Sequence, residues 1–238
     1  MKLTGTHLGI LVILLYFGAQ SCMANEIYIN QVGDDLKLEV VQDGEDNYFQ
    51  YCAVNNDSNC TDVNGNAHNR ADGVASDNAI VNSETIGNDN TVVVAHATGQ
   101  NNSNINESNI SVTGDRNKVQ NFFSNHSSGS NAYSNLSWGG TKESNISITG
   151  DDNTVNHSSD SYGEVEANIS VSGDDNTVTV YQRSLRNTAN ISVTNAGGPV
   201  TANLQQLGSS YQDTSPNSYS VTQYCTNANG CAVNVTQN

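Results

Sequence analysis

The sequence predicts an all-β fold, a β-solenoid of stacked strand-turn-strand repeats, and three observations support this class. After its first 24 residues the chain has 22 Val and 10 Ile but 6 Leu, and β-branched side chains suit a pleated strand better than a helix. Only two prolines, Pro199 and Pro216, remove a backbone donor from strand ladders. Apolar residues alternate with polar ones, as at Ile169 and Val171, and no segment has a clear 3.6-residue period.

A repeat of about 22 to 23 residues predicts where the strands lie along the chain. Its copies start at Glu107 (ESNISVTGDRNKV), Glu143 (ESNISITGDDNTV), Glu166 (EANISVSGDDNTV) and Thr188 (TANISVTNAGG), and residues 86–92 form a half copy. One such unit cannot bury its apolar face, so neighbouring units must stack, with strands about 4.8 Å apart. A β-sandwich with similar hairpins is the alternative fold.

Each unit predicts which side chains form the core. Successive side chains of a strand alternate between its two faces, so Ile and Val should point inward while Asn and Ser point outward. The predicted core residues are Ile110, Val112, Ile146, Ile148, Ile169, Val171, Ile191 and Val193, and the predicted outward residues are Asn109, Asn145, Asn168 and Asn190.

The turn between the two strands of a unit carries a glycine followed by Asp and Asn. Glycine adopts positive φ without strain, and Asp and Asn side chains can bond their own backbone. The predicted turn glycines are Gly33, Gly44, Gly87, Gly114, Gly150 and Gly173. The turn acids, such as Asp151 and Asp152, could hold Ca²⁺, but they lack a calcium-roll pattern and we interpret them as solvated turns.

Residues 1–24 are predicted to be a signal peptide. Lys2 precedes an apolar run of 11 residues, 8–18, which is too short to span a bilayer. Cleavage after Ala24 leaves small residues before the cut, and acylation at Cys22 is the alternative. We therefore expect a secreted protein, extracellular or at the cell surface, with no membrane span after signal removal.

Residues 25–238 then form a single repetitive domain, with irregular insertions near residues 52–80 and 121–142. Four cysteines remain in this domain, and export makes their oxidation plausible. Their spacings of 8 and 6 residues favour two local disulfides, namely Cys52–Cys60 and Cys225–Cys231. A zinc site is the alternative, but the spacings do not form CxxC pairs, and we expect no metal and no cofactor.

Charge and composition exclude several classes of function. Asp and Glu number 24 against 8 Lys and Arg, a net charge of −16, so no basic surface exists to bind nucleic acid. The five His are scattered, and the acidic residues recur at the turns as a structural feature would. We therefore expect no enzymatic activity.

Short motifs near residue 25 resemble the curlin repeat, in which Gln-x-Gly-x-x-Asn is followed by a second Gln 11 residues after the first. Gln31 and Gln42 have this spacing, each lies two residues before a glycine, and Asn47 follows the second. Leu36 stands where the family has Asn, and the later copies keep Gly-x-x-Asn but lack the leading Gln. The resemblance implies a ladder of stacked amides formed by Gln31, Gln42, Asn47, Asn90, Asn117, Asn153 and Asn176.

Curlins are exported subunits that assemble outside the cell into amyloid fibres, which serve adhesion and the biofilm matrix. The resemblance thus implies a secreted structural fibre subunit whose main partner is another copy of itself, stacked end to end. A nucleator subunit and an outer-membrane export pore are further partners that it implies. The alternative is a soluble β-solenoid adhesin that binds a surface or glycan, on a phage or a cell-surface appendage.

Overall fold

The computed structural model of the chain is all-β, which confirms the predicted class. The structure describes residues 2–5, 10–16, 26–31, 36–44, 47–53, 78–87, 89–98, 105–114, 116, 118–125, 141–150, 152–160, 163–173, 175–184, 186–195, 201–208, 217–225 and 232–237. No helix occurs within these residues.

The described strands form two sheets. The odd sheet has nine strands: β1 (Lys2–Gly5), β3 (Glu26–Gln31), β5 (Tyr48–Ala53), β7 (Thr91–Thr98), β9 (Lys118–Asn125), β11 (Thr154–Asp160), β13 (Thr177–Ser184), β15 (Thr201–Gly208) and β17 (Ala232–Gln237). The even sheet has eight strands: β2 (Ile10–Tyr16), β4 (Lys37–Asp43), β6 (Ile80–Ile86), β8 (Asn106–Thr113), β10 (Lys142–Thr149), β12 (Glu164–Ser172), β14 (Arg186–Asn195) and β16 (Ser218–Cys225).

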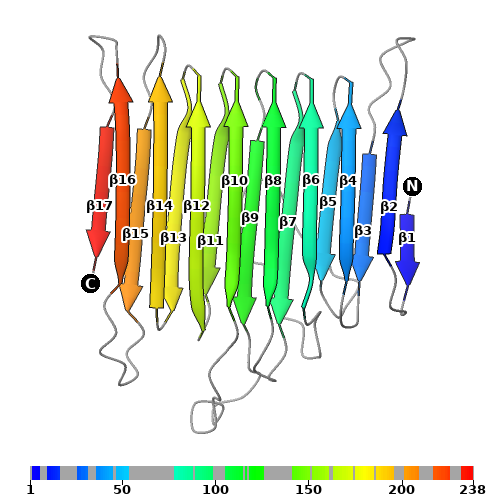
Figure 1. Cartoon of the computed structure of the whole chain (residues 1–238), viewed down its shortest axis with the longest axis horizontal. Coiled ribbons are helices and arrows are strands. Elements are labelled where there is room, and N and C mark those ends of the chain that lie inside the picture. Colours follow the sequence, from blue (N-terminus) through cyan, green and yellow to red (C-terminus); the bar gives the residue numbers. More distant parts are fainter. Residues whose placement is uncertain are drawn as a thin grey trace, which may run out of the picture.

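Strands that follow one another in the chain lie in different sheets, and each strand pairs in parallel with the strand two places before it and two places after it. The units are therefore not hairpins, because the strands on either side of a turn do not pair. In Figure 1 the strands succeed one another along the long axis, with the two termini at opposite ends of the molecule. We call each even strand and the odd strand that follows it a rung.

The register places equivalent residues of the repeat side by side. Asn109 pairs with Asn145, Asn145 with Asn168, and Asn168 with Asn190. The offsets in sequence are 36, 23 and 22 residues, so one insertion is accommodated without a shift of the faces. We call a set of register-aligned positions in successive strands a column.

Aliphatic columns fill the space between the sheets. All eight predicted core residues are buried, with side chains 2% exposed or less. Opposite them, in the odd sheet, Val92, Val119, Val155 and Val178 form one buried column. Burial of each such side chain stabilises the fold by about 2 kcal/mol.

Three sequence-based boundaries can be compared with the strands. The predicted insertion at 121–142 starts too early, because β9 continues to Asn125 with Asn121 and Phe123 buried. In the region 52–80, residues 54–77 lie outside the described residues. Residues 2–5 and 10–16 of the predicted signal peptide pair with β3 and β4, the cleavage site lies outside the described residues, and removal of residues 1–24 stays a prediction.

Candidate functional site

One edge of the molecule is built from stacked glycine turns. We call it the turn edge: here even strands pass into odd strands, at Gly44, Gly87, Gly114, Gly150 and Gly173, all with φ between 118° and 141°. A Cβ on Gly150 would lie 2.2 Å from the carbonyl oxygen of Gly114, and one on Gly87 only 1.8 Å from that of Gly44. Because each turn lies directly on the turn before it, only glycine fits this column.

Asparagine closes each glycine turn by hydrogen bonds in two directions. The Asn47 side chain donates to the carbonyl of Gly44 at 2.8 Å, and Asn153 donates to that of Gly150 at 2.7 Å. The side-chain oxygen of Asn176 accepts the backbone N–H of Asn153 at 3.1 Å. The Asn therefore bonds back across its own turn and sideways to the next turn.

The interior Gln residues link the two sheets. Gln182 donates to the carbonyl of Thr188 at 3.1 Å, and Gln206 donates to that of Ser218 at 3.0 Å, so each joins an odd strand to the even strand that follows. Gln206 also donates to Gln182 at 2.9 Å. Gln42 joins its strand to the next one by donating to Tyr48 at 3.3 Å.

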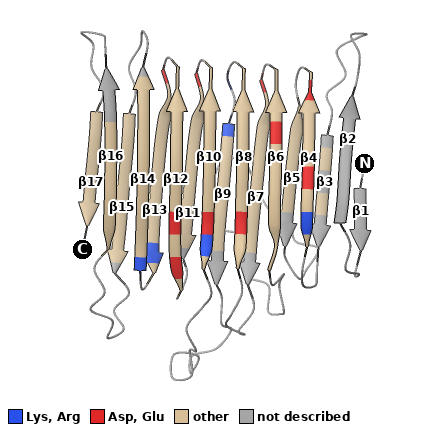
Figure 2. Cartoon of the chain, viewed as in Figure 1, with Lys and Arg blue, Asp and Glu red and all other residues tan. Residues whose placement is uncertain are grey.

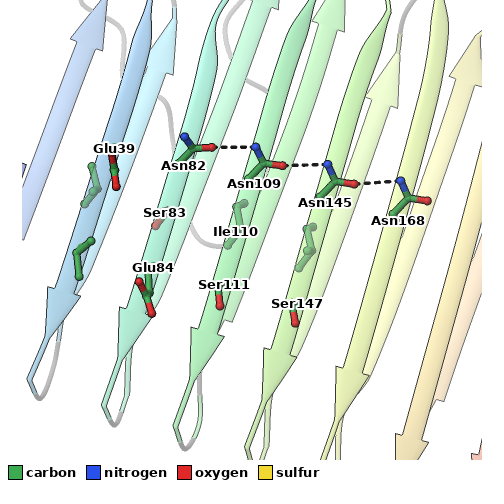
Figure 3. A pocket seen from close by; sticks show the side chains of 13 residues that line it. Glu39, Asn82, Ser83, Glu84, Asn109, Ile110, Ser111, Asn145, Ser147 and Asn168 are labelled. Atoms are coloured by element: carbon green, nitrogen blue, oxygen red, sulfur yellow. Dashed lines mark hydrogen bonds between the residues drawn. The ribbon is translucent and has the colours of Figure 1, made fainter. Parts of the chain in front are cut away.

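The outer face of the even sheet carries a continuous chain of side-chain amides, which we call the Asn ladder: Asn82, Asn109, Asn145, Asn168 and Asn190. Each Nδ2 donates to the Oδ1 of the residue one strand earlier, at 2.8, 2.9, 3.0 and 2.8 Å along the chain. Figure 3 shows four of these amides in one row, with Ser111 and Ser147 beside them. All the bonds point the same way, so the ladder has a direction along the long axis.

Carboxylates accompany the Asn ladder. Glu107, Glu143 and Glu166 form one column of the even sheet, and each accepts a hydrogen bond from the Asn two residues on, at 2.7, 2.9 and 3.1 Å. A shallow groove of about 410 Å³ runs along this face from Glu39 to Asn168. Its lining combines amides, hydroxyls and carboxylates with aliphatic residues such as Val41, and the polar groups could bind a hydroxyl-rich ligand.

Away from the turn edge, the interior contains a polar cluster. Ser108 Oγ donates to Asn121 Oδ1 at 3.1 Å, and Asn121 Nδ2 donates to Ser144 Oγ at 2.7 Å. His96 Nε2 lies 2.9 Å from Ser108 Oγ. Because the Ser108 proton is directed to Asn121, we assign the proton of this contact to His96 Nε2.

Two buried imidazoles flank Phe123 in this cluster. The ring of His96 is 5.1 Å from that of Phe123, and the ring of Phe123 is 5.9 Å from that of His157. Burial, and in second place the charge of Lys142, lower the pKa of His96 from 6.5 to about 3. Burial lowers the pKa of His157 from 6.5 to about 4, so both rings are neutral at pH 7.

The C-terminal end of the two sheets is open within the described residues. β16 and β17 are the last strands of their sheets, and Tyr219 and Val233, which occupy core columns, are 48% and 37% exposed. The chain has no charged residue after Asp213. Figure 2 shows charged residues on several strands between β4 and β14 and none on the described parts of β15 to β17.

The structure brings most of the predicted ladder and turn residues together in columns near the turn edge. These predicted ladder residues differ in burial from the Asn ladder of the outer face. Gln42, Asn47, Asn90, Asn153 and Asn176 are buried, at most 1% exposed, whereas the Asn ladder lies on the outer face. Gly33, Asn117, Cys60 and Cys231 lie outside the described residues, and the side chains of Gln31, Cys52 and Cys225 are not described. Both disulfides therefore stay predictions.

Sequence reasoning missed Asn82 and the polar cluster. Asn82 has no Asn-Ile-Ser signature around it, and only its two-residue offset before Glu84 places it on the outer face. His157 interrupts the column of Val180 and Leu204, whereas His96 and Lys142 lie in columns of mixed polarity, and no local pattern marks any of the three. A register-based alignment of the strands would have placed all four.

No protein-family model matches the chain, and neither a curated protein nor a solved structure matches it. Among the described residues, no three His, Cys, Asp or Glu side chains gather in a way that could hold a metal ion. Within the same residues, no helix is long and apolar enough to cross a membrane.

Proposed function

We propose that the chain is a β-solenoid and a secreted structural subunit that self-assembles end to end into curli-like extracellular filaments for adhesion or biofilm matrix. The observation that carries the proposal is the open C-terminal rung. Its strands β16 and β17 offer unpaired backbone groups on one side, with partly exposed core positions and no charge.

The amino-acid composition of the two edge strands supports this proposal. Soluble β proteins normally protect edge strands with charges, prolines or short strands, because an exposed edge templates another strand. Here β16 has eight residues and β17 has six, and neither contains Lys, Arg, Asp, Glu or Pro. Each of these strands therefore leaves an edge to which a strand of another copy could add.

The ladders also support growth along the long axis. Gln206 and Gln182 stack inside, and the five amides of the Asn ladder stack outside. Aligned amide ladders stabilise stacked strands of identical chains in fibres. The Gln row reaches the C-terminal edge, because Gln237 of β17 pairs in register with Gln206, whereas the Asn ladder ends at Asn190, beside Ser220 of β16.

The soluble adhesin is the second candidate, and the groove along the Asn ladder favours it. Its lining by Asn82, Asn109, Ser111 and Ser147 repeats along the axis, as a ligand with a repeating pattern of hydroxyl groups would require. Filament formation and binding on this face are compatible, because the groove lies on the side of the sheets and growth occurs at their ends.

Electron microscopy and thioflavin fluorescence of the secreted, purified chain test the proposal. Filaments should form on standing at neutral pH. Val233→Lys should slow growth about tenfold or more, because it places an unpaired charge in a core position of the junction. The control Ser170→Lys, on the exposed outer face of β12, should assemble at nearly the wild-type rate. A folded wild-type chain that stays monomeric would favour the soluble adhesin.

A further inference from the structure

We infer that successive copies in the filament are related by a half turn about the long axis, so that β3 of each new copy stacks on β16 of the copy before it and β4 stacks on β17. This inference rests on the proposed function and on the removal of residues 1–24, and it adds the orientation and the partner strands of the junction. Each side of the filament then alternates between the even sheet of one copy and the odd sheet of the next.

Hydrogen bonds in the interior indicate that the strands climb in a continuous spiral. They join His96 on β7 to Ser108 on β8, Ser108 to Asn121 on β9, and Asn121 to Ser144 on β10, at 2.9, 3.1 and 2.7 Å. Along the axis β8 therefore lies between β7 and β9, and β9 lies between β8 and β10. Each strand is thus about half a strand spacing further along the axis than the strand before it.

The number of strands determines the orientation of the next copy. Among the described residues after residue 24, the odd sheet has the eight strands from β3 to β17 and the even sheet the seven from β4 to β16, which makes 15 strands. Because the spiral alternates between the sheets, the strand that follows β17 belongs beside β16, in the even sheet. A copy in the same orientation would put its β3 in the odd sheet and leave that place empty.

A half turn about the long axis puts β3 in that place and keeps every pairing parallel. Odd and even strands run in opposite directions, as the arrows in Figure 1 show. The half turn exchanges the two sheets and reverses the direction of each strand, so β3 of the next copy runs parallel to β16, and β4 runs parallel to β17. Both strands take parallel partners within this chain, because β1 pairs with β3 and β2 pairs with β4.

Odd and even strands have equivalent inward positions, as a half-turn junction requires. In the even strand β4, Gln42 donates to the carbonyl of Tyr48 at 3.3 Å, and in the odd strand β13, Gln182 donates to that of Thr188 at 3.1 Å. Both bonds reach the residue six positions further on, near the start of the next strand. Both strands also have buried aliphatic residues two and four positions before the Gln: Val40, Leu38, Val180 and Val178. An odd strand can therefore continue the columns of the even sheet.

The strands at the junction carry Gln at this same inward position. Gln223 of β16 occupies the column of Gln42. Gln237 of β17 occupies the column of Gln182, and so does Gln31, the residue after Asn30 in β3. All four strands of the junction can therefore be aligned on their Gln residues.

This alignment gives the register of the junction. The residues of the next copy and their partners are Gln31 with Gln223 and Ile29 with Val221 in one sheet, and Gln42 with Gln237 and Val40 with Val235 in the other. Amide meets amide and aliphatic meets aliphatic in both sheets. A slip of one residue would turn the aliphatic side chains to the outer face, and a slip of two would put each Gln beside a residue other than Gln.

Helical reconstruction from electron micrographs of the filaments tests the orientation. With 15 strands per copy at half of the usual strand spacing, we expect a rise of about 36 Å per copy and a rotation of about 180°. Copies in one orientation would instead show a rotation near zero and a rise of about 38 Å, which is eight full strand spacings.

Four single substitutions on β17 test the register. It puts Lys37 of the next copy beside Ala232 and Glu39 beside Asn234, and all four residues are exposed. Opposite charges attract across strands and like charges repel. Ala232→Glu should therefore assemble more readily than Asn234→Glu, and Asn234→Lys more readily than Ala232→Lys.

Each of these comparisons joins two variants of equal net charge. The Asn234 side chain donates to Asn203 at 2.8 Å, and the reversal of order between the Glu and Lys variants separates the charge effect from the loss of this bond. The readout is the soluble concentration left at the growth plateau. We expect a ratio of about two- to fivefold within each comparison at low salt, shrinking at high salt.

The outcomes separate the half turn from the proposed function. A rotation of about 180° together with the predicted reversal of order supports the inference. Filaments whose copies share one orientation, or whose Glu and Lys variants show no reversal, overturn the inference and leave self-assembly standing. Absence of wild-type filaments would instead overturn the proposed function, and the half turn with it.

Discussion

The interior near the turn edge differs from the interior near the opposite edge, where odd strands pass into the next even strand. Near the turn edge the even strands contribute Ile or Val in every rung from β8 to β14, all at most 2% exposed. Near the opposite edge β8 and β10 contribute Asn106, Ser108, Lys142 and Ser144, which are equally buried, whereas β12 contributes Val165 and Ala167. In the rungs that start with β8 and β10, the half near the turn edge is thus aliphatic and the half near the opposite edge is mostly polar, and we call them the aliphatic half and the polar half.

The difference between the two halves arises from the way the strands are connected at each edge. Stacked glycine turns leave the turn edge no room for variation, since any added Cβ meets the previous turn. At the opposite edge the strands are separated by stretches of different length, from one residue between β13 and β14 to 26 between β5 and β6. A core beside uniform turns can repeat one aliphatic pattern, whereas the other half contains a different set of side chains in each rung.

Gly150→Ala should have the largest effect, because it disrupts the turn edge itself. The new Cβ would be 2.2 Å from the carbonyl oxygen of Gly114, and the φ of 132° is unfavourable for alanine. We expect a loss of about 4 kcal/mol in the free energy of unfolding, from strain and overpacking together. Thr149→Ala, at the exposed neighbouring position, is the control and should cost less than about 1 kcal/mol. Urea unfolding monitored by circular dichroism measures both.

Ile148→Ala should destabilise the aliphatic half by about 3 kcal/mol. The side chain is 1% exposed and lies in the column between Val112 and Val171, so its truncation leaves a cavity. Ser147→Ala, on the exposed face of the same strand, is the matched control. Equal losses for the two variants would contradict the assignment of faces.

The aliphatic half was predictable from sequence, and the polar half was not. Alternation places Ile146 and Ile148 inward with no knowledge of the rest of the chain, and the glycines mark the turns. Lys142 and His157 break the alternation of apolar and polar residues, and polar residues in a strand ordinarily indicate the outer face. The hydrogen bonds of this half, such as that from Asn121 to Ser144, join residues that come together only when the register is known.

Acid should weaken the polar half, because its imidazoles are buried in the neutral form. The pKa of His157 is about 4 in the folded chain against 6.5 in the unfolded chain. Between these values the unfolded chain binds more protons, so the free energy of unfolding falls as the pH is lowered from about 6.5 towards 4. The pKa of His96, lowered to about 3, adds to the same trend. For His157 alone the loss approaches about 3 kcal/mol.

His157→Leu tests this contribution. Neither ring nitrogen of His157 has a hydrogen-bond partner among the described residues, so the substitution should not break a bond and should reduce the loss of stability on acidification. The measurement is urea unfolding at pH 7 and at pH 5. An unchanged pH dependence in the variant would mean that His157 is not buried in its neutral form.

The smallest expected effects come from two serines of the polar half, and their signs should be opposite. Ser144 and Ser159 are both 0% exposed, so the change to alanine removes the same atom from equally buried sites. Ser144 Oγ accepts a hydrogen bond from Asn121 at 2.7 Å, and its loss leaves a buried donor without an acceptor, which costs about 1 to 3 kcal/mol. Ser159 Oγ has no hydrogen-bond partner among the residues that the structure describes. Removing that hydroxyl relieves the penalty of burying it and should stabilise the fold by up to about 1 kcal/mol.

Thermal and urea unfolding of the two variants side by side measure the difference. If Ser159→Ala destabilises as much as Ser144→Ala, the two hydroxyls are equally well bonded and the polar half is more completely satisfied than its contacts indicate.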